Sequence, residues 1–260
     1  MLTVVHACLR DGRGGSPTAV LDESPMPDAE RRLVPGRAGA SHAVFLAADG
    51  GVRFFTAEGE LPACGHGTVA ALAVLAHRTG RPEHLLRVSG RTFWGRAHAV
   101  REKVFDVAFD PGPITVRPAD ESEISEISQA IGVGGATTGA CVATLGRPRM
   151  LLPVADRDVL AGMTPDLEML RAATDRLGFL GCYVYTVPDV GGRAAARMFA
   201  PSIGVPEDIA NANSTACLAA HLGIDLRVDM GDSLGSPATV TAVQQPGDGV
   251  LVGGEAALPP

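Results

Sequence analysis

The feature that most limits how this chain can fold is an order of elements that occurs twice. In the first half, residues 52–56 read as the strand after a Gly-rich hairpin turn, and an Ala/Leu/Val-rich helix is expected at 68–77. In the second half, strands are expected at 182–187 and 193–199, followed by a helix at 214–222. Each half places an acidic residue and a loop of small residues between its hairpin and its helix. This shared order favours an internal duplication over a chance likeness of two Ala-rich helices.

The duplication predicts two lobes that face each other, each presenting the N-terminus of a helix to the space between them. With 260 residues the chain can bury a substantial core in this form. Outside the repeat, residues 104–109 alternate like a strand, and 113–118 read as a crossing between the lobes. Residues 120–131 read as a polar-faced helix that ends at Gly132.

The basic residues are almost all arginine, because Lys103 is the one lysine among 22 basic residues. A Schiff-base or pyridoxal enzyme needs a lysine that can lose its proton. Lys103 lies in a charged, strand-like stretch, which favours a solvated side chain over a catalytic one. Pyridoxal chemistry is therefore nearly excluded.

Charge and cysteine content restrict the partners and the compartment. A net charge of −7 without a basic run makes nucleic acid and anionic membranes poor partners. No signal peptide is visible, and no apolar stretch approaches the roughly 18 residues that a membrane-spanning helix needs. The five cysteines are an odd number without a Cys-x-x-Cys pair, which argues against a disulfide framework or a structural zinc site. We therefore expect a protein of the reducing cytoplasm.

The small-residue loops before the two expected helices are candidate anion sites. A helix N-terminus has free backbone N–H groups and a partial positive charge, so it binds carboxylates. Gly65 and Gly67 let a ligand come close to that backbone. Two such ends at one cleft would hold a small carboxylate and stabilise the enolate-like charge that forms when a neighbouring C–H loses its proton. The alternative is that these glycines only make a tight turn from strand to helix.

Cys64 and His66 are the reactive side chains of the first loop. A thiol directly before a helix suits proton abstraction or nucleophilic attack, although a buried, purely structural cysteine is the alternative. His66 can contact a substrate or hold the loop by a hydrogen bond. A metal bound by this pair would need two further ligands, and no clear partners lie nearby in the sequence. We therefore expect no metal site.

Several segments together resemble one family. Residues 60–70, ELPACGHGTVA, resemble the E-x-x-x-C-G-H-x-T loop and helix of PhzF-like proteins, which have the diaminopimelate epimerase fold. Residues 197–208 are similar to their second-lobe R-M-F-A-P and G-x-x-E-D-P segments. Residues 15–20 resemble their G-N-P-x-A-V, and residues 230–232 and 252–254 are similar to their C-terminal end. The resemblance spans nearly the whole chain.

This resemblance implies an α+β fold of two pseudo-symmetric lobes, each a barrel-like β-sheet around a central helix, with the active site in the cleft between them. The N-terminal lobe would span residues 1–115 and be completed by about 246–260 returning to it, and the C-terminal lobe would span 116–245. Such enzymes use no cofactor and move protons on small carboxylates, and homodimers are common among them. We therefore expect a small-molecule carboxylate substrate, no cofactor and a homodimer.

The chain departs from the family pattern at two places. His42 stands where the isomerases have the glutamate that acts as general acid and base, and an imidazole can also move protons near neutrality. In the second loop Asn-Ala-Asn at 211–213 replaces Thr-Gly-Ser, while the acidic pair at 207–208 is kept. Related racemases and epimerases use one cysteine from each lobe. Cys64 matches the first, but Asn211 stands at the second, which disfavours a two-cysteine racemase.

The leading hypothesis is a cofactor-independent enzyme of specialised, antibiotic-type metabolism. It would isomerise a small unsaturated or cyclic carboxylate through an enolate-like intermediate. His42 would be the acid/base, with Cys64 or Asp208 as the second proton carrier. The substrate-binding residues would be Gly65, His66, Gly67, Asn211, Ala212, Asn213 and Ser214.

Two alternatives remain open. The same enolate can leave after water attacks a neighbouring carbonyl, which is C–C bond hydrolysis. PhzF-like proteins of alkylproline-type antibiotic pathways are understood to remove an oxalyl unit in this way. The other alternative is a non-catalytic binding protein, which the missing glutamate motivates and the intact loop at 64–68 disfavours.

Overall fold

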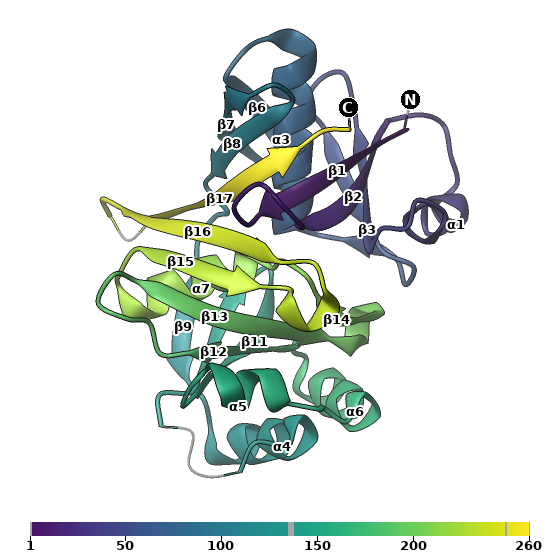
Figure 1. Cartoon of the computed structure of the whole chain (residues 1–260). Coiled ribbons are helices and arrows are strands. Elements are labelled where there is room, and N and C mark those ends of the chain that lie inside the picture. The colour runs from purple at the N-terminus through teal and green to yellow at the C-terminus, as the bar shows by residue number, and fades with distance from the viewer. Residues whose placement is uncertain (1, 135–137, 248, 260) are drawn as a thin grey trace.

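In each half of the chain, strands surround one central helix (Figure 1). The computed structural model describes residues 2–134, 138–247 and 249–259. The first half contains strands β1 (Leu2–Leu9), β2 (Ser16–Asp22), β3 (His42–Leu46), β4 (Val52–Phe55), β5 (Glu60–Leu61), β6 (Glu83–Val88), β7 (Arg91–Arg101) and β8 (Val104–Phe109). Its helices are α1 (Asp28–Arg31), α2 (Val34–Arg37) and α3 (Gly65–Thr79).

The second half repeats this plan and adds helices on its outer side. Its strands are β9 (Thr115–Pro118), β10 (Cys141–Leu145), β11 (Arg147–Val154), β12 (Cys182–Thr186), β13 (Arg193–Ala200), β14 (Val205–Asp208), β15 (Leu226–Met230), β16 (Ala238–Gln245) and β17 (Gly249–Ala257). Its helices are α4 (Glu121–Ile131), α5 (Arg157–Gly162), α6 (Leu167–Leu177) and α7 (Ala212–Leu222), with short 3-10 turns at Pro201–Ile203 and Asp232–Leu234.

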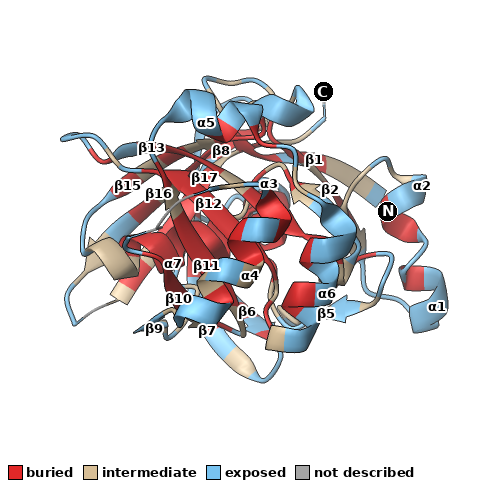
Figure 2. Cartoon of the chain, turned by 90° about the horizontal axis from the view of Figure 1, so that it is seen from below, coloured by how far each residue is buried: buried red, intermediate tan, exposed pale blue. Residues whose placement is uncertain are grey.

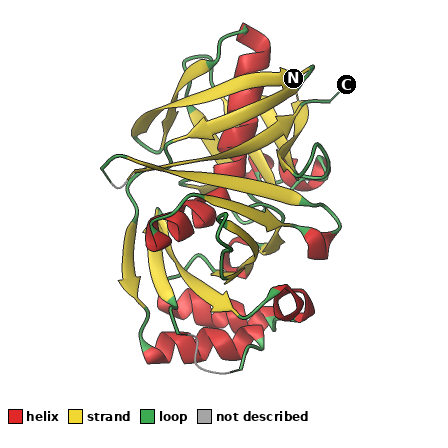
Figure 3. Cartoon of the chain, turned by 60° about the vertical axis from the view of Figure 1, so that its left-hand side comes forward, coloured by secondary structure: helices red, strands yellow, loops and turns green. Residues whose placement is uncertain are grey.

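The first-half strands close into a barrel around α3. Pairing runs from β1 to β2, β3 and β4, passes to β6 through a bridge between Gly51 and Arg87, and continues through β7 and β8. β17 then pairs with both β8 and β1 and completes the ring. The Ala, Val and Leu side chains of residues 69–74 are all buried, because strands lie on every side of this helix (Figure 3).

The pairing order of the second half matches that of the first. β10 pairs antiparallel with β11, as β1 does with β2, and β11 pairs parallel with β12, as β2 does with β3. β12 pairs antiparallel with β13, as β3 does with β4, and β13 pairs parallel with β15, as β4 does with β6 through its bridge. β15 then pairs with β16 as β6 does with β7, and α7 packs inside this sheet. The predicted fold of pseudo-symmetric lobes built around central helices is confirmed.

The second-half sheet is covered on both faces because its side chains alternate. Tyr183 and Tyr185 of β12 point inward to the core around α7, while Cys182 and Val184 point outward. The outward set packs under α4, α5 and α6, whose outer faces are exposed (Figure 2). Both tyrosines therefore belong to the packed interior, and the Tyr183 hydroxyl lies 2.8 Å from the Thr215 hydroxyl.

The central helices begin earlier than the sequence pattern predicts. α3 starts at Gly65 rather than 68, and α7 starts at Ala212 rather than 214, because Cys64 and Asn211 occupy the N-cap positions. The small residues assigned to loops therefore form first helical turns. These first turns meet between the lobes, where Gly65 packs against Ala212 and the backbone of Asn213.

Among the described residues, none of the helices combines the length and apolarity required to pass through a lipid bilayer.

Candidate active site

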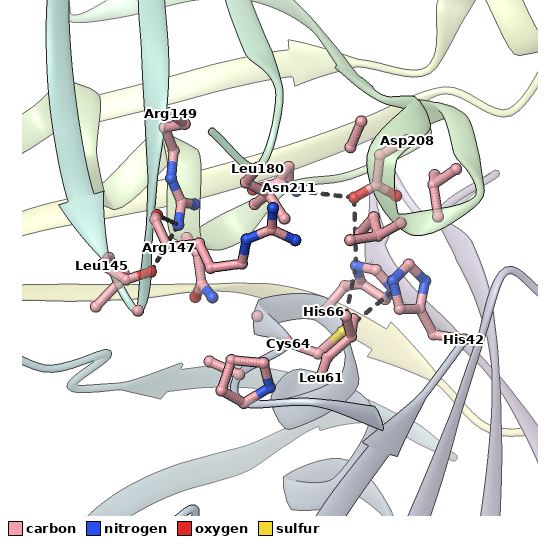
Figure 4. A pocket seen from close by; sticks show the side chains of 18 residues that line it. His42, Leu61, Cys64, His66, Leu145, Arg147, Arg149, Leu180, Asp208 and Asn211 are labelled. Carbon is pink, nitrogen blue, oxygen red and sulfur yellow. Dashed lines mark hydrogen bonds and ion pairs between the residues drawn. The ribbon is translucent and has the colours of Figure 1, made fainter. Parts of the chain in front are cut away.

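The meeting point of the two lobes encloses a small cavity of about 40 Å³ (Figure 4). Both halves of the chain line it, and its polar residues include two histidines, a cysteine and two arginines. His42, Cys64 and His66 lie on the first-half side, and Arg147 and Arg149 lie opposite (Figure 4). The other lining residues include Leu61, Pro62, Ala63, Gly65, Leu145, Gly146, Leu180, Asp208, Asn211 and Asn213.

His42 begins β3 and is 3% exposed. Its Nδ1 lies 2.8 Å from the Ser41 hydroxyl, and its ring packs edge-on against His66 with centroids 4.4 Å apart. Burial, and secondly the neighbouring His66, hold the pKa of His42 well below its usual value. The imidazole is therefore neutral near pH 7 and has a lone pair on one ring nitrogen.

Cys64 and His66 form a close pair at the start of α3. The Cys64 sulfur lies 3.6 Å from His66 Nε2, and both side chains are buried. His66 Nδ1 donates a hydrogen bond of 2.9 Å to the Ala210 carbonyl of the other half. Burial alone would lower the pKa of His66, but the charges of Cys64 and Asp208 and these hydrogen bonds outweigh it and raise the pKa to about 9. His66 therefore carries a positive charge at neutral pH.

Asp208 ends β14 and is 4% exposed. Its Oδ2 accepts a 2.9 Å hydrogen bond from the Asn211 amide and lies 3.9 Å from His66 Nδ1. Its Oδ1 is buried and has no hydrogen-bond partner among the described residues. Burial raises the pKa of Asp208 despite the neighbouring His66. The Oδ1 atom can therefore present an oxygen to a ligand in the cavity.

Asn211 holds the start of the second central helix. Its Oδ1 accepts a 2.9 Å hydrogen bond from the Ser214 backbone N–H, so the side chain caps α7. Asn213 faces the cavity from the first turn. The N-termini of α3 and α7 thus both adjoin the cavity with their partial positive charges.

The predicted residues fall into two groups. Those that line the cavity are His42, Cys64, Gly65, His66, Asp208, Asn211 and Asn213. Of the described residues, Gly67, Ala212 and Ser214 lie behind this lining. Gly67 packs against the Cys64 sulfur and the Phe54 ring, and Ala212 packs against Gly65. Ser214 is fully buried and its hydroxyl accepts a hydrogen bond from Arg149.

We expect Gly65→Ala to lower the free energy of unfolding by about 1–3 kcal/mol, because overpacked interiors cost this much. The added Cβ would lie 2.6 Å from the Ala212 Cβ and 3.0 Å from the Asn213 backbone nitrogen, so the helix ends would have to separate. Urea unfolding measures the effect. Gly36→Ala is the matched control, since no heavy atom of the described chain lies within 4 Å of a Cβ placed there. Equal stabilities of the two variants would contradict the tight contact between the helix ends.

Sequence reasoning did not identify Arg149, which is 1% exposed. Its Nη2 donates to the carbonyls of Leu145 and Arg147 at 2.6 and 2.9 Å, and its Nη1 donates to the Ser214 hydroxyl at 3.2 Å. Within the described part of the chain its Nε has no partner and no carboxylate forms a salt bridge with it. Burial lowers the pKa of this guanidinium, which shows the cost of the unpaired position. An arginine directly before the apolar run at 150–152 is the signal that marks it in the sequence.

The first-half side of the cavity also gathers ligand types that bind metals. One ligand atom each of His42, Cys64 and His66 lies within 4.8 Å of the other two. The sequence pattern showed no third ligand for the Cys64 and His66 pair, because His42 comes from a different strand. The fold brings His42 beside this pair.

Comparison with known proteins places this site in a family context. The profile of the family described as "Phenazine biosynthesis-like protein" matches residues 10–257. The chain is 26% identical over 227 residues to the "uncharacterized isomerase YddE" of Escherichia coli K12, covering 81% of this chain and 74% of that protein. It is 25% identical over 223 residues to the trans-2,3-dihydro-3-hydroxyanthranilate isomerase of Pseudomonas fluorescens, covering 84% of this chain and 77% of that protein.

A solved structure shares the whole fold. The structure titled "predicted epimerase" of Pseudomonas aeruginosa superposes with a TM-score of 0.83 at 25% sequence identity. The match covers 100% of this chain and 96% of that one. The two-lobed fold is thus shared with a protein described as an epimerase.

Proposed function

The chain belongs to the phenazine biosynthesis-like protein family, and on that premise we propose that it is an isomerase of a small unsaturated or cyclic carboxylate. The reaction would move a proton between carbon atoms through an enolate-like intermediate. The observation that supports the proposal is the composition of one cavity. Groups that can transfer protons line it together with the buried Arg149, whose Nε has no partner among the described residues, and with two helix N-termini.

The positive groups suit a carboxylate substrate. Arg149 is buried without a salt bridge among the described residues, and Arg147 lines the same side of the cavity. Backbone N–H groups at the starts of α3 and α7 add partial positive charge. A bound carboxylate would supply the anion that the desolvated guanidinium lacks, and charge-assisted hydrogen bonds are the strong ones.

The opposite wall supplies the proton carriers. Neutral His42 would take the proton from the C–H next to the activated group, and the electron pair would pass into the enolate. The positive helix ends would stabilise that developing charge. A proton would return to a different carbon from Asp208, whose raised pKa keeps it protonated more readily, or from Cys64. Substrate and product then differ only in the position of one hydrogen.

The test is hydrogen exchange in deuterated water. Trans-2,3-dihydro-3-hydroxyanthranilate, the compound in the name of one relative, and a panel of cyclic unsaturated carboxylates serve as probes. We expect at least one probe to gain a carbon-bound deuterium without fragmentation, observed by NMR and mass spectrometry. Cys64→Ala should slow this exchange, whereas Cys182→Ala, which alters a buried thiol facing the outer helices, should not. Exchange that is equally fast without the enzyme, for every probe, would sink the proposal.

C–C bond hydrolysis is the second candidate, and the environment of His42 is compatible with it. A buried, neutral imidazole at the edge of the cavity can remove a proton from water as readily as from carbon. The hydroxide would attack a carbonyl next to the enolate-forming carbon, and the C–C bond would break toward the enolate. The same incubations in heavy-oxygen water separate the two reactions. Label in a released acid supports hydrolysis, and a product of unchanged mass supports isomerisation.

A further inference from the structure

The His42, Cys64 and His66 side chains form a compact group of nitrogen and sulfur ligands. Each is at most 6% exposed, and one ligand atom of each lies within 4.8 Å of the others. The Cys64 sulfur lies 3.6 Å from His66 Nε2. Bond lengths of 2.3 Å for Zn–S and about 2.0 Å for Zn–N put the two ligands of a tetrahedral zinc ion about 3.6 Å apart. The Cys64 and His66 pair is therefore already spaced as zinc ligands are.

The outer contacts of both imidazoles are those of metal-binding histidines. A metal-bound imidazole usually gives its second nitrogen to a carbonyl, a carboxylate or a hydroxyl, which fixes the ring. His66 Nδ1 donates to the Ala210 carbonyl, with the Asp208 carboxylate 3.9 Å from the same atom. His42 Nδ1 is held by the Ser41 hydroxyl at 2.8 Å. His66 thus keeps its Nε2, which lies beside the Cys64 sulfur, for an ion once that nitrogen has lost its proton.

The ligand chemistry selects the class of ion. A thiolate with two imidazoles suits a borderline, thiophilic divalent ion such as Zn²⁺, whereas Mg²⁺ and Ca²⁺ take oxygen ligands. Three protein ligands leave a fourth position, as in sites where zinc also holds a water or a small anion. The group lines the cavity, so that position can face it.

We propose that His42, Cys64 and His66 bind one Zn²⁺ ion and that the ion switches off the proton transfer in this cavity. The Cys64 thiol proton and the Nε2 proton of the charged His66 both leave to solvent as these atoms coordinate, and the lone pair of His42 is no longer free to accept a proton. Metal binding stands on the geometry of the group alone, whereas the inhibition rests on the proposed function. Thiophilic ions would then act as reversible inhibitors of this enzyme.

The test uses Co²⁺ as a spectroscopic probe on the metal-stripped, full-length chain. We expect one equivalent to bind, with a thiolate-to-cobalt charge-transfer band and the visible bands of a tetrahedral ion, and Zn²⁺ to displace it. Cys64→Ala should lose the charge-transfer band, whereas Cys182→Ala should keep it. Ser41→Ala should keep the band and weaken binding about 10–100-fold, because outer contacts of ligands contribute this much.

Three results would overturn the assignment. They are a wild-type chain without a charge-transfer band, a band that persists in Cys64→Ala, and a His42→Gln variant that binds Co²⁺ as tightly as the wild type. The first needs no variant, so a variant that fails to fold does not obscure the answer. A chelated enzyme without exchange activity would count against the proposed function, while the cobalt spectrum would still report the metal site.

Discussion

His42→Gln is expected to lower the rate of substrate deuterium exchange by about 10²–10⁴-fold, the usual contribution of a positioned general acid or base. Glutamine matches much of the buried volume and can keep a hydrogen bond to Ser41, but it cannot accept a proton at neutral pH. The fold should remain intact, because His42 is neutral in its buried position and no ion pair is lost. Exchange rates at saturating substrate, together with circular dichroism, measure both effects.

His77→Gln provides the matched control. His77 lies exposed near the C-terminal end of α3, at the far end of the helix whose start carries Cys64 and His66. The same chemical change there should leave the exchange rate within about twofold of the wild type, since exposed substitutions are usually within 0.5 kcal/mol. A His42→Gln enzyme as fast as this control would remove His42 from the reaction.

Arg149→Met is expected to raise KM about 10–100-fold with a smaller change in kcat. A hydrogen bond to a charged group contributes about 1.5–3 kcal/mol, and every 1.4 kcal/mol is tenfold in affinity. Methionine fills the buried space but cannot attract a carboxylate, and it leaves the Leu145 and Arg147 carbonyls without their donor. The split between KM and kcat distinguishes a substrate anchor from a proton carrier.

Arg31→Met separates this effect from general damage to the fold. Arg31 is also buried, at 3% exposure, but it pairs with Glu23 and packs against Phe45, and it does not line the cavity among the described residues. Its replacement should lower the free energy of unfolding and leave KM unchanged. An Arg149→Met enzyme with wild-type KM would show that the substrate carboxylate lies elsewhere.

Local sequence patterns were sufficient to predict several helices and strands of the fold. The helix expected at 120–131 is α4, because Asp120 and Glu123 form a capping box and Gly132 ends the helix in the left-handed conformation. The expected hairpin strands correspond to β4, β12 and β13. The sequence analysis did not predict α5 and α6, whose buried residues Leu160, Leu170 and Ala173 pack on the outer face of the second-half sheet. Both helices carry local signals, because Asp156 and Asp166 are their N-caps and Gly178 ends α6 in the left-handed conformation.

In the site, too, some residues could be predicted from their neighbours in the sequence, whereas others depend on contacts between distant elements. Cys64 and His66 lie two positions apart in one motif, and Asp208 and Asn211 occupy matching positions of the repeat. The sequence alone therefore identified all four as candidates. The role of Arg149 depends on β11 lying beside α7, which brings the Ser214 hydroxyl to its guanidinium. The contact between His42 and His66 joins separate elements in the same way. Antibiotic-type metabolism, a homodimer, the cytoplasm and the lobe boundaries stay predictions from the sequence.

The return of β17 to the first-half barrel has a consequence for biosynthesis. β17 separates β1 from β8, yet the ribosome makes it more than a hundred residues after both. Until residues 249–257 emerge, both neighbours keep an open hydrogen-bonding edge, and α3 lacks one wall of its enclosure. Such long-range pairing is slow to form. The first lobe to be synthesised is therefore among the last parts to be sealed, and the cavity between the lobes matures only when translation of that strand is complete.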